Sequence, residues 1–289
     1  MKVLSEYHSA IMGTVEEKGI YFNTIVSIDT SEKTQNEVSR EVTDKTLKIL
    51  RDLLVERIGY IIPSKELHKK LCTKRITDFA SISSLIDNVN FEFRSIVEES
   101  TKWIQPIPIA VITDSDRTKV LIVKKNEKSA VLDSPERNKL LLYVGGHSRK
   151  EDCTINNERD FLSLCRATLG REIKEEIGIT VDLEALSPYI IYTPDLDKSR
   201  KHFAVCFVIQ MDIDELNLRL DPAELRLTRG ASKSGKFFSI GELVHHVSEL
   251  ESWGIEILKE FFNVRLDQIN TDGQVSLSEL LMNTDETIH

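Results

Sequence analysis

Three glutamates in the segment GREIKEEIGIT (170–180) have a spacing that could bind a metal ion. Glu172, Glu175 and Glu176 are related as i, i+3 and i+4, so on a helix their Cβ atoms lie about 5–6 Å apart on one face. The like charges of Glu172 and Glu176 would cost roughly 0.2–0.5 kcal/mol there. A hard divalent cation would remove this cost, because Mg²⁺ binds carboxylate oxygens and keeps positions for water and phosphate.

The helix that would carry these glutamates is predicted over residues 160–177. Its apolar residues follow helical spacing and form one stripe: Leu162, Cys165, Leu169, Ile173 and Ile177. Gly178 stands where a left-handed C-cap ends a helix. The alternative is a solvated surface helix, since Glu and Lys are good helix formers.

The segments around this helix predict an α/β domain over residues 105–265. Strands are expected at 105–114, 119–125, 140–144, 187–193, 202–211 and 236–240. Strands mixed with two or three helices favour an α/β sandwich with a mixed sheet.

Residues 1–104 are predicted to form a smaller α+β N-terminal domain without a catalytic motif. A strand is expected at 19–28, and helices at 45–62, at about 64–75 and at 81–104. The polar residues 266–289 are predicted to form a C-terminal tail.

The composition favours a cytoplasmic protein. The chain has 289 residues and a formal net charge of −9, which argues against broad non-specific binding of nucleic acid. No apolar run approaches the roughly 20 residues that span a bilayer, and the first residues lack the apolar segment of a signal peptide. The four cysteines are scattered, so a reducing compartment is expected.

The segment Arg171–Ile179 resembles the end of the Nudix hydrolase signature, R-E-U-x-E-E-x-G-U with U aliphatic, at every specified position. Gly146 follows a predicted strand and resembles the first glycine of that signature. Asp152 stands six residues later, where the family has glutamate. Eighteen residues then precede Arg171, where the family has seven, so the motif carries an insertion of eleven residues. The chain is similar to a branch of the family with a lengthened motif.

The resemblance implies a Nudix-like α/β/α sandwich and a pyrophosphohydrolase. Its substrate would be a small-molecule phosphoanhydride, such as a nucleoside diphosphate derivative. Mg²⁺ or Mn²⁺ would be held by Glu172, Glu175, Glu176, the Gly146 carbonyl and Asp152.

The resemblance also implies roles for residues around the metal. Arg171 would pair with a carboxylate and fix its rotamer. Glu224 or Glu175 would act as general base, and His147 and His202 would contact phosphate or base.

Alternative functions remain open at this point. An RNA cap or 5′-end processing enzyme would use the basic segments 68–75 and 198–202 as an RNA path, with steep salt dependence. A non-catalytic nucleotide-binding regulator would keep the fold, and a helical adaptor would act through the first 100 residues. No membrane partner is expected, and a homodimer is compatible with each alternative.

Overall fold

The structure is a computed structural model, and it describes residues 8–17, 20–29, 34–37, 56–86, 88–125, 136, 139–153, 160–195, 199–214, 216–222, 224–226 and 234–265. The chain divides into two units. The first comprises residues 1–58 and 91–99, and the second comprises residues 59–90 and 100–289.

The first unit contains an antiparallel hairpin of β1 (His8–Glu17) and β2 (Ile20–Asp29), which confirms the strand expected at 19–28. It also contains half of β3 (Arg57–Tyr60), which pairs with β5 (Asn90–Phe93), and the helix α3 (Arg94–Glu99). The helix expected over 45–62 is therefore wrong at its end, because residues 57–60 form a strand. Residues 45–55 lie outside the described part.

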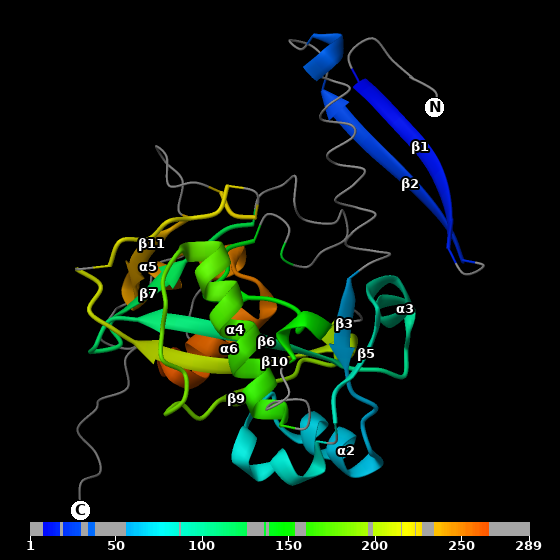
Figure 1. Ribbon diagram of the computed structural model, residues 1–289. Helices are drawn as coiled ribbons and strands as arrows, with labels where there is room; N and C mark the ends of the chain where they lie inside the picture. The colour runs from blue at the N-terminus through cyan, green and yellow to red at the C-terminus, as the bar shows by residue number, and fades with distance from the viewer. Residues whose placement is uncertain are drawn as a thin grey trace, which may run out of the picture. The chain divides into compact units, whose positions relative to one another are not determined.

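The second unit is built on a seven-stranded mixed sheet in the order β11-β7-β6-β10-β9-β4, with β8 paired to β6 (Figure 1). The strands are β4 (Ile76–Asp78), β6 (Gln105–Thr113), β7 (Lys119–Ile122), β8 (Val144–Gly145), β9 (Tyr189–Ile191), β10 (His202–Gln210) and β11 (Lys236–Ser239). The central pair β6–β10 is parallel, and the other pairs are antiparallel. The predicted mixed sheet is confirmed.

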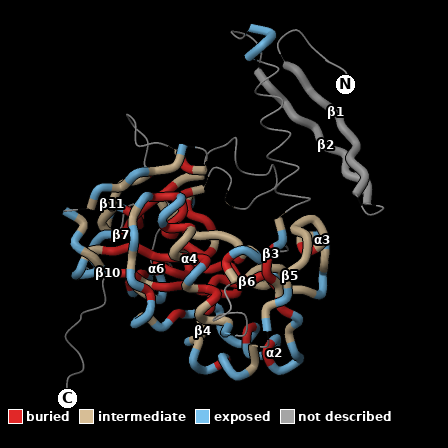
Figure 2. Tube along the Cα trace, in the orientation of Figure 1, coloured by how far each residue is buried: buried red, intermediate tan, exposed pale blue. Residues whose placement is uncertain are grey.

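Helices cover both faces of this sheet. The α-helices of the second unit are α2 (Lys65–Thr73), α4 (Phe161–Ile177), α5 (Ile240–Val244) and α6 (Ser252–Phe261). Short 3₁₀ helices are η2 (Phe79–Ser81), η3 (Ser83–Leu85), η4 (Lys150–Asp152), η5 (Ser199–Lys201) and η6 (Val247–Glu249). Figure 1 shows α4 in front of the sheet and α6 behind it, which is the expected α/β/α sandwich. Buried residues concentrate in the sheet, whereas α2 is largely exposed (Figure 2).

The ends of α4 are set by local sequence. Asp160 caps its N-terminus, because its carboxylate accepts from the backbone N–H groups of Leu162 and Ser163. Gly178 ends it with a φ of 75°, in the left-handed region that glycine adopts without strain. Four members of the predicted stripe are buried, namely Cys165, Leu169, Ile173 and Ile177, while Leu162 is half-buried. Burial of each aliphatic side chain contributes about 1.5–3 kcal/mol to holding α4 on the sheet.

The division between the two units differs from the expected boundary at residue 104. Strand β4 pairs with β9 at the edge of the main sheet, with Ile76 opposite Ile191, and helix α2 also belongs to the second unit. A strand of three residues has too little periodicity to be assigned to a sheet from sequence.

None of the described helices is long and apolar enough to cross a membrane. The predicted tail, residues 266–289, lies outside the described part.

Candidate active site

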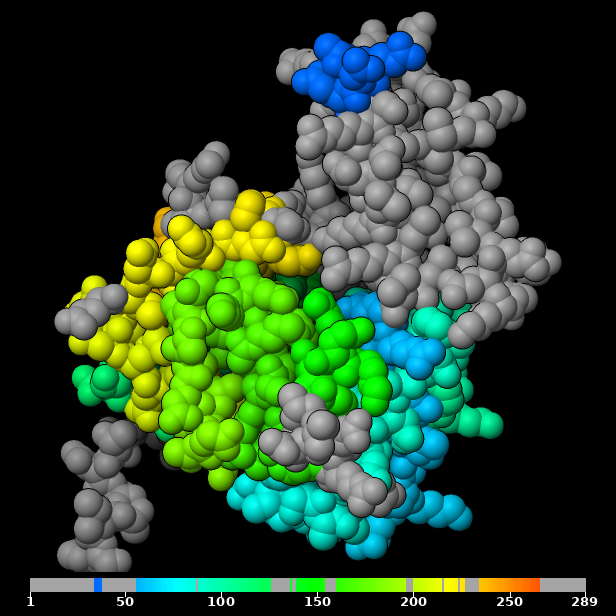
Figure 3. Space-filling model, viewed as in Figure 1, coloured from blue at the N-terminus to red at the C-terminus, as the bar shows by residue number. Residues whose placement is uncertain are grey.

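Two glycines at the end of β8 bring backbone against the C-terminal half of α4. Gly145 has a φ of 145°, and a Cβ there would lie 2.2 Å from the carbonyl oxygen of Pro108. A Cβ on Gly146 would lie 2.7 Å from Oε1 of Glu172, so a side chain there would displace that carboxylate from its present position. Figure 3 shows the Gly145–Cys153 segment (bright green) lying against α4 (yellow-green). Glycine at 145 therefore lets β8 lie close to the backbone of β6, and glycine at 146 leaves room for the Glu172 carboxylate.

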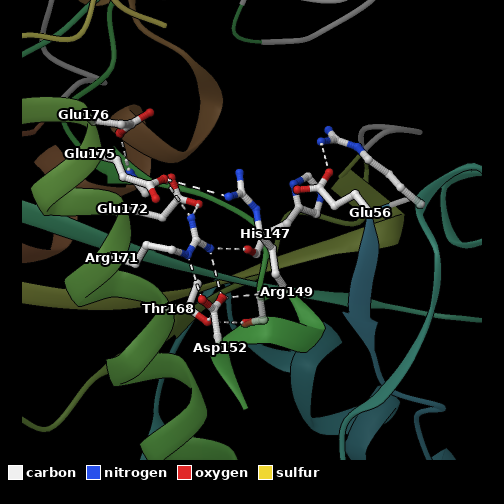
Figure 4. Close-up of polar contacts among 12 residues, drawn as sticks. Glu56, His147, Arg149, Asp152, Thr168, Arg171, Glu172, Glu175 and Glu176 are labelled. Atoms are coloured by element: carbon white, nitrogen blue, oxygen red, sulfur yellow. Dashed lines mark hydrogen bonds and ion pairs between the residues drawn. The ribbon is translucent and has the colours of Figure 1, made fainter. Parts of the chain in front are cut away.

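Arg171 is the centre of the polar contacts on this part of α4 (Figure 4). Its Nε and Nη2 donate to the two carboxylate oxygens of Asp152, at 2.7 and 2.9 Å. Its Nη1 donates to Glu172 at 2.7 Å and to Glu175 at 3.1 Å. Nη2 also donates to the carbonyl oxygen of His147 at 3.2 Å. One guanidinium thus joins the helix to η4 and to the loop after β8.

Asp152 uses both carboxylate oxygens inside the protein. Besides Arg171, its Oδ2 accepts from the backbone N–H of Arg149 and from the Thr168 hydroxyl, each at 2.9 Å. Burial alone would raise the pKa of Asp152, but the hydrogen bonds from Arg171 and Arg149 outweigh it and hold the pKa below its usual value. Asp152 is therefore a buried, ionised partner of Arg171.

Glu172 and Glu176 lie one turn apart on the buried side of α4, only 8% and 3% exposed. Burial raises the pKa of Glu172, and the charge of Arg171 offsets this only in part. Burial likewise raises the pKa of Glu176, against the opposing charge of Lys125. Two acids in this position are costly as anions, because each has lost water and lies near a like charge.

Lys125, just beyond β7, is the counter-ion of Glu176. Its Nζ lies 2.6 Å from Oε1, and the backbone N–H of Gly145 donates to Oε2 at 3.0 Å. Burial would lower the pKa of Lys125, but the charges of Glu176 and Glu136 raise it above its usual value. Lys125 was not predicted as a site residue. The signal available for it was a lysine at the end of an apolar strand.

A second group of acids, near Tyr143, includes Glu136, which interacts electrostatically with Lys125. Tyr143 donates its hydroxyl to Glu251 at 2.9 Å and to Glu136 at 3.2 Å. Burial raises the pKa of Glu136, although Lys125 opposes it. Lys125 therefore carries the positive charge between several buried carboxylates.

Glu175 differs from its two neighbours because half of its side chain, 51%, is exposed. It faces Arg171 at 3.1 Å and Arg149 at 3.9 Å. Glu224, the other candidate base, follows the turn that begins at Asp221 and interacts electrostatically with Lys125. The backbone N–H of Asp221 donates to the carbonyl oxygen of Glu176 at 2.9 Å, so this loop covers the end of α4.

The two predicted histidines lie beside each other. The ring centroids of His147 and His202 are 5.9 Å apart, and the rings are arranged edge to face. His147 Nε2 shares a 3.0 Å hydrogen bond with Oε1 of Gln105, which pairs with His202 across β6 and β10. Gln105 is fully buried, and its Nε2 has no hydrogen-bond partner in the described part of the chain. Gln105 was not identified from the sequence, because a strand-end glutamine carries no motif.

The structure therefore groups the predicted residues around Arg171 and Lys125. Glu172, Glu176 and Asp152 lie against the loop that holds Gly146 and His147, and Glu175 is exposed at its edge. Within the described residues, no three His, Cys, Asp or Glu side chains are arranged as metal ligands. The carboxylates are paired with Arg171 and Lys125 instead, and their predicted metal-binding role stays a prediction.

Solved structures that are similar to the chain include two described as Nudix hydrolases. Tm1382, "a putative Nudix hydrolase", is 18% identical over 72% of this chain and 100% of its own, with a TM-score of 0.49. A MutT Nudix hydrolase from Burkholderia pseudomallei is 17% identical over 47% of this chain and 85% of its own, with a TM-score of 0.31. No protein-family model matches the chain, and no curated protein matches it in sequence. The family named in both descriptions is the one that the segment Arg171–Ile179 resembles.

Proposed function

We propose that the chain is a divalent-metal-dependent hydrolase that cleaves the diphosphate linkage of a nucleoside diphosphate derivative or a related small molecule. One observation carries the proposal. Glu172 and Glu176 are held side by side, more than nine-tenths buried, against the Gly145-Gly146 backbone. The segment that holds them has the residue pattern of a pyrophosphohydrolase signature.

The electrostatics of this pair support a cation site. Both carboxylates lie near the C-terminal end of α4, where the helix dipole is negative. Buried acids with raised pKa values often mark functional sites, because structure alone gains little from them. The donor atoms fit Mg²⁺ or Mn²⁺, which prefer carboxylate and carbonyl oxygens. Glu172, Glu175, Glu176 and the Gly146 carbonyl would hold the ion.

A bound divalent ion would neutralise phosphoryl charge and lower the pKa of an attacking water. The protein's own groups would do the rest. Arg171 would orient the carboxylates of Glu172 and Glu175, which it contacts at 2.7 and 3.1 Å. Glu175 is the accessible carboxylate of the three, so its oxygen would accept the proton of the attacking water, with Glu224 as the alternative base. Asp152 would hold Arg171 in place, since its own oxygens accept four hydrogen bonds within the protein.

A nucleotide-binding regulator without catalysis is the second candidate, and Lys125 favours it. Its ammonium lies 2.6 Å from Glu176 and supplies the positive charge that a metal would bring. A protein that keeps the fold but replaces the metal with an internal cation would show this contact.

Turnover separates the two candidates. The full chain is assayed on nucleoside diphosphate derivatives with Mg²⁺, Mn²⁺ or EDTA, and Mn²⁺ binding is measured separately by electron paramagnetic resonance. We expect metal-dependent release of phosphorylated products, at least a hundredfold slower in Glu176→Gln. Glu184→Gln is the matched control, because Glu184 is exposed and pairs only with Arg166 among the described contacts. No turnover and no Mn²⁺ binding in a protein that binds nucleotide would favour the regulator.

A further inference from the structure

A cavity of about 340 Å³ in the second unit is separate from the carboxylate site on α4. It is lined by residues from three segments: helix α2, the stretch before β6, and the connection from β9 to β10. The side chains that matter here are His68, Thr101, Lys102, Ile104, Tyr192 and Arg200. Its volume lies in the range of small-molecule sites.

The described lining of this cavity carries positive charge and no acid. Lys102 and Arg200 contribute two cations, and His68 and Thr101 add polar groups. The chain as a whole has a formal charge of −9, so a cavity whose described lining holds two cations and no acid differs in sign from the net charge of the chain. Lining of this kind attracts anions.

The cationic side of the cavity is held in place by backbone contacts. Arg200 donates its Nε to the carbonyl oxygen of Pro194 at 2.9 Å, and the Tyr192 hydroxyl donates to the carbonyl oxygen of Arg200 at 3.1 Å. His68 lies edge-on to Tyr192, with ring centroids 6.5 Å apart. Thr193, between two lining residues, is fully buried and its hydroxyl has no partner in the described part. These contacts join Tyr192, Pro194 and Arg200 at the cavity, next to a buried hydroxyl that has no described hydrogen-bond partner.

We propose that this cavity binds a phosphorylated small molecule, with its phosphate on Lys102 and Arg200 and its less polar part against Ile104. Arginine and lysine are the side chains that recognise phosphate most often, through charge-assisted hydrogen bonds. The apolar Ile104 and Tyr192 at the same cavity favour a molecule with a less polar part over a bare ion.

Two sources of this ligand are compatible with the fold. It can be a separate phosphorylated molecule, or the far end of the hydrolase substrate, which rests on the proposed function. Ile104 directly precedes Gln105, and Arg200 lies two residues before His202; Gln105 and His202 are the pair next to His147. Four residue steps along β6 lead from Gln105 to Ile109, the partner of Gly145, a distance of about 13 Å. An extended substrate could therefore reach both sites.

The test measures binding of AMP and inorganic phosphate to the full chain by calorimetry in EDTA, where the metal site plays no part. We expect AMP to bind, and Lys102→Ala to weaken its binding about tenfold. Lys69→Ala is the control, because Lys69 is exposed on α2 and does not line the cavity. Circular dichroism checks that both variants fold.

Steady-state kinetics on a hydrolysed diphosphate derivative distinguishes the sources. A KM raised about tenfold in Lys102→Ala, with kcat unchanged, identifies the cavity as a substrate subsite. An unchanged KM with AMP binding retained identifies a separate ligand. The proposal is overturned if AMP does not bind, or if Lys102→Ala binds it as tightly as Lys69→Ala. It is also overturned if a 5′-phosphorylated RNA binds more than tenfold tighter than AMP with steep salt dependence, since the ligand is then RNA. If the chain has no hydrolase activity, the measurement of AMP binding in EDTA still tests the cavity.

Discussion

Replacing Arg171 with methionine tests how the site is assembled. The change removes hydrogen bonds to Asp152, Glu172, Glu175 and the His147 carbonyl while keeping an unbranched side chain. The Asp152 side chain is only 5% exposed, so it would be left as a buried charge without its cation. Breaking a buried pair in this way costs about 3–5 kcal/mol of unfolding free energy.

Two further variants separate charge from geometry. Arg171→Lys keeps the charge but loses the two-pronged contact with Asp152, and we expect it to cost about 1.5–3 kcal/mol. In a double-mutant cycle of Arg171→Met with Asp152→Asn, the combined loss should fall short of the sum by about 1–3 kcal/mol. The neutral amide of the double variant no longer needs a cation, which is the reason for the shortfall.

Urea unfolding followed by tryptophan fluorescence measures these energies in the relevant unit. Trp103 and Trp253 are the tryptophans of the chain, and both lie in the second unit together with Arg171. A loss below 1 kcal/mol for Arg171→Met, or losses that add within about 0.5 kcal/mol in the cycle, would refute the view that the buried pair holds the site together.

Three other perturbations have expected outcomes that follow from single contacts. Gly145→Ala should lower the free energy of unfolding in urea by about 2 kcal/mol or more, because its Cβ would overlap a backbone carbonyl and its φ is 145°. Gly170→Ala should raise the free energy of unfolding by about 0.5–1 kcal/mol, because nothing lies within 4 Å of its Cβ. Lys125→Met should lower the free energy of unfolding by about 3–5 kcal/mol, because it leaves Glu176 without its cation. Most of this loss should be recovered in the double variant Lys125→Met/Glu176→Gln, measured the same way. The pKa of Asp152 is lower in the folded protein than in the unfolded chain, where it is about 3.9, so ionised Asp152 stabilises the fold above that pH. This stability is lost as the pH falls through the folded pKa. Asp152→Asn should therefore show a shallower loss of unfolding free energy in acid titrations.

Local sequence was sufficient to predict α4 and its ends. The capping carboxylate of Asp160, the apolar spacing and Gly178 are short-range signals, and each acts within a few residues. The strand at 57–60 was missed because the four residues RIGY continue an apolar helical spacing, and pairing with β5 decides their conformation. The place of β4 in the main sheet was missed for the same reason, since its partner β9 lies more than 100 residues away.

The site was predictable only in part. The spacing of Glu172, Glu175 and Glu176 predicts that they share one side of a helix. It did not reveal that two of them are buried and the third is half-exposed, because burial depends on the loop that packs against α4. Lys125 comes from a strand about 50 residues earlier, and no local pattern connects it with Glu176. Long-range ion pairs of this kind depend on topology rather than on sequence spacing.

The contacts of Glu176 would link the proposed metal binding to the internal cation Lys125. A divalent ion at Glu176 must compete with an ammonium 2.6 Å away, whose own pKa is raised and which therefore stays charged at neutral pH. Burial also raises the pKa of Glu176, so protons compete with the metal as the pH falls. Both effects oppose metal binding. Removing Lys125 relieves the first but strengthens the second, because the charge and hydrogen bond of Lys125 lower the pKa of Glu176. Metal affinity that rises with pH, and that is higher in Lys125→Met at a pH where Glu176 is ionised, is therefore the signature of a cation site at Glu176, whereas a pair that serves structure alone would show neither.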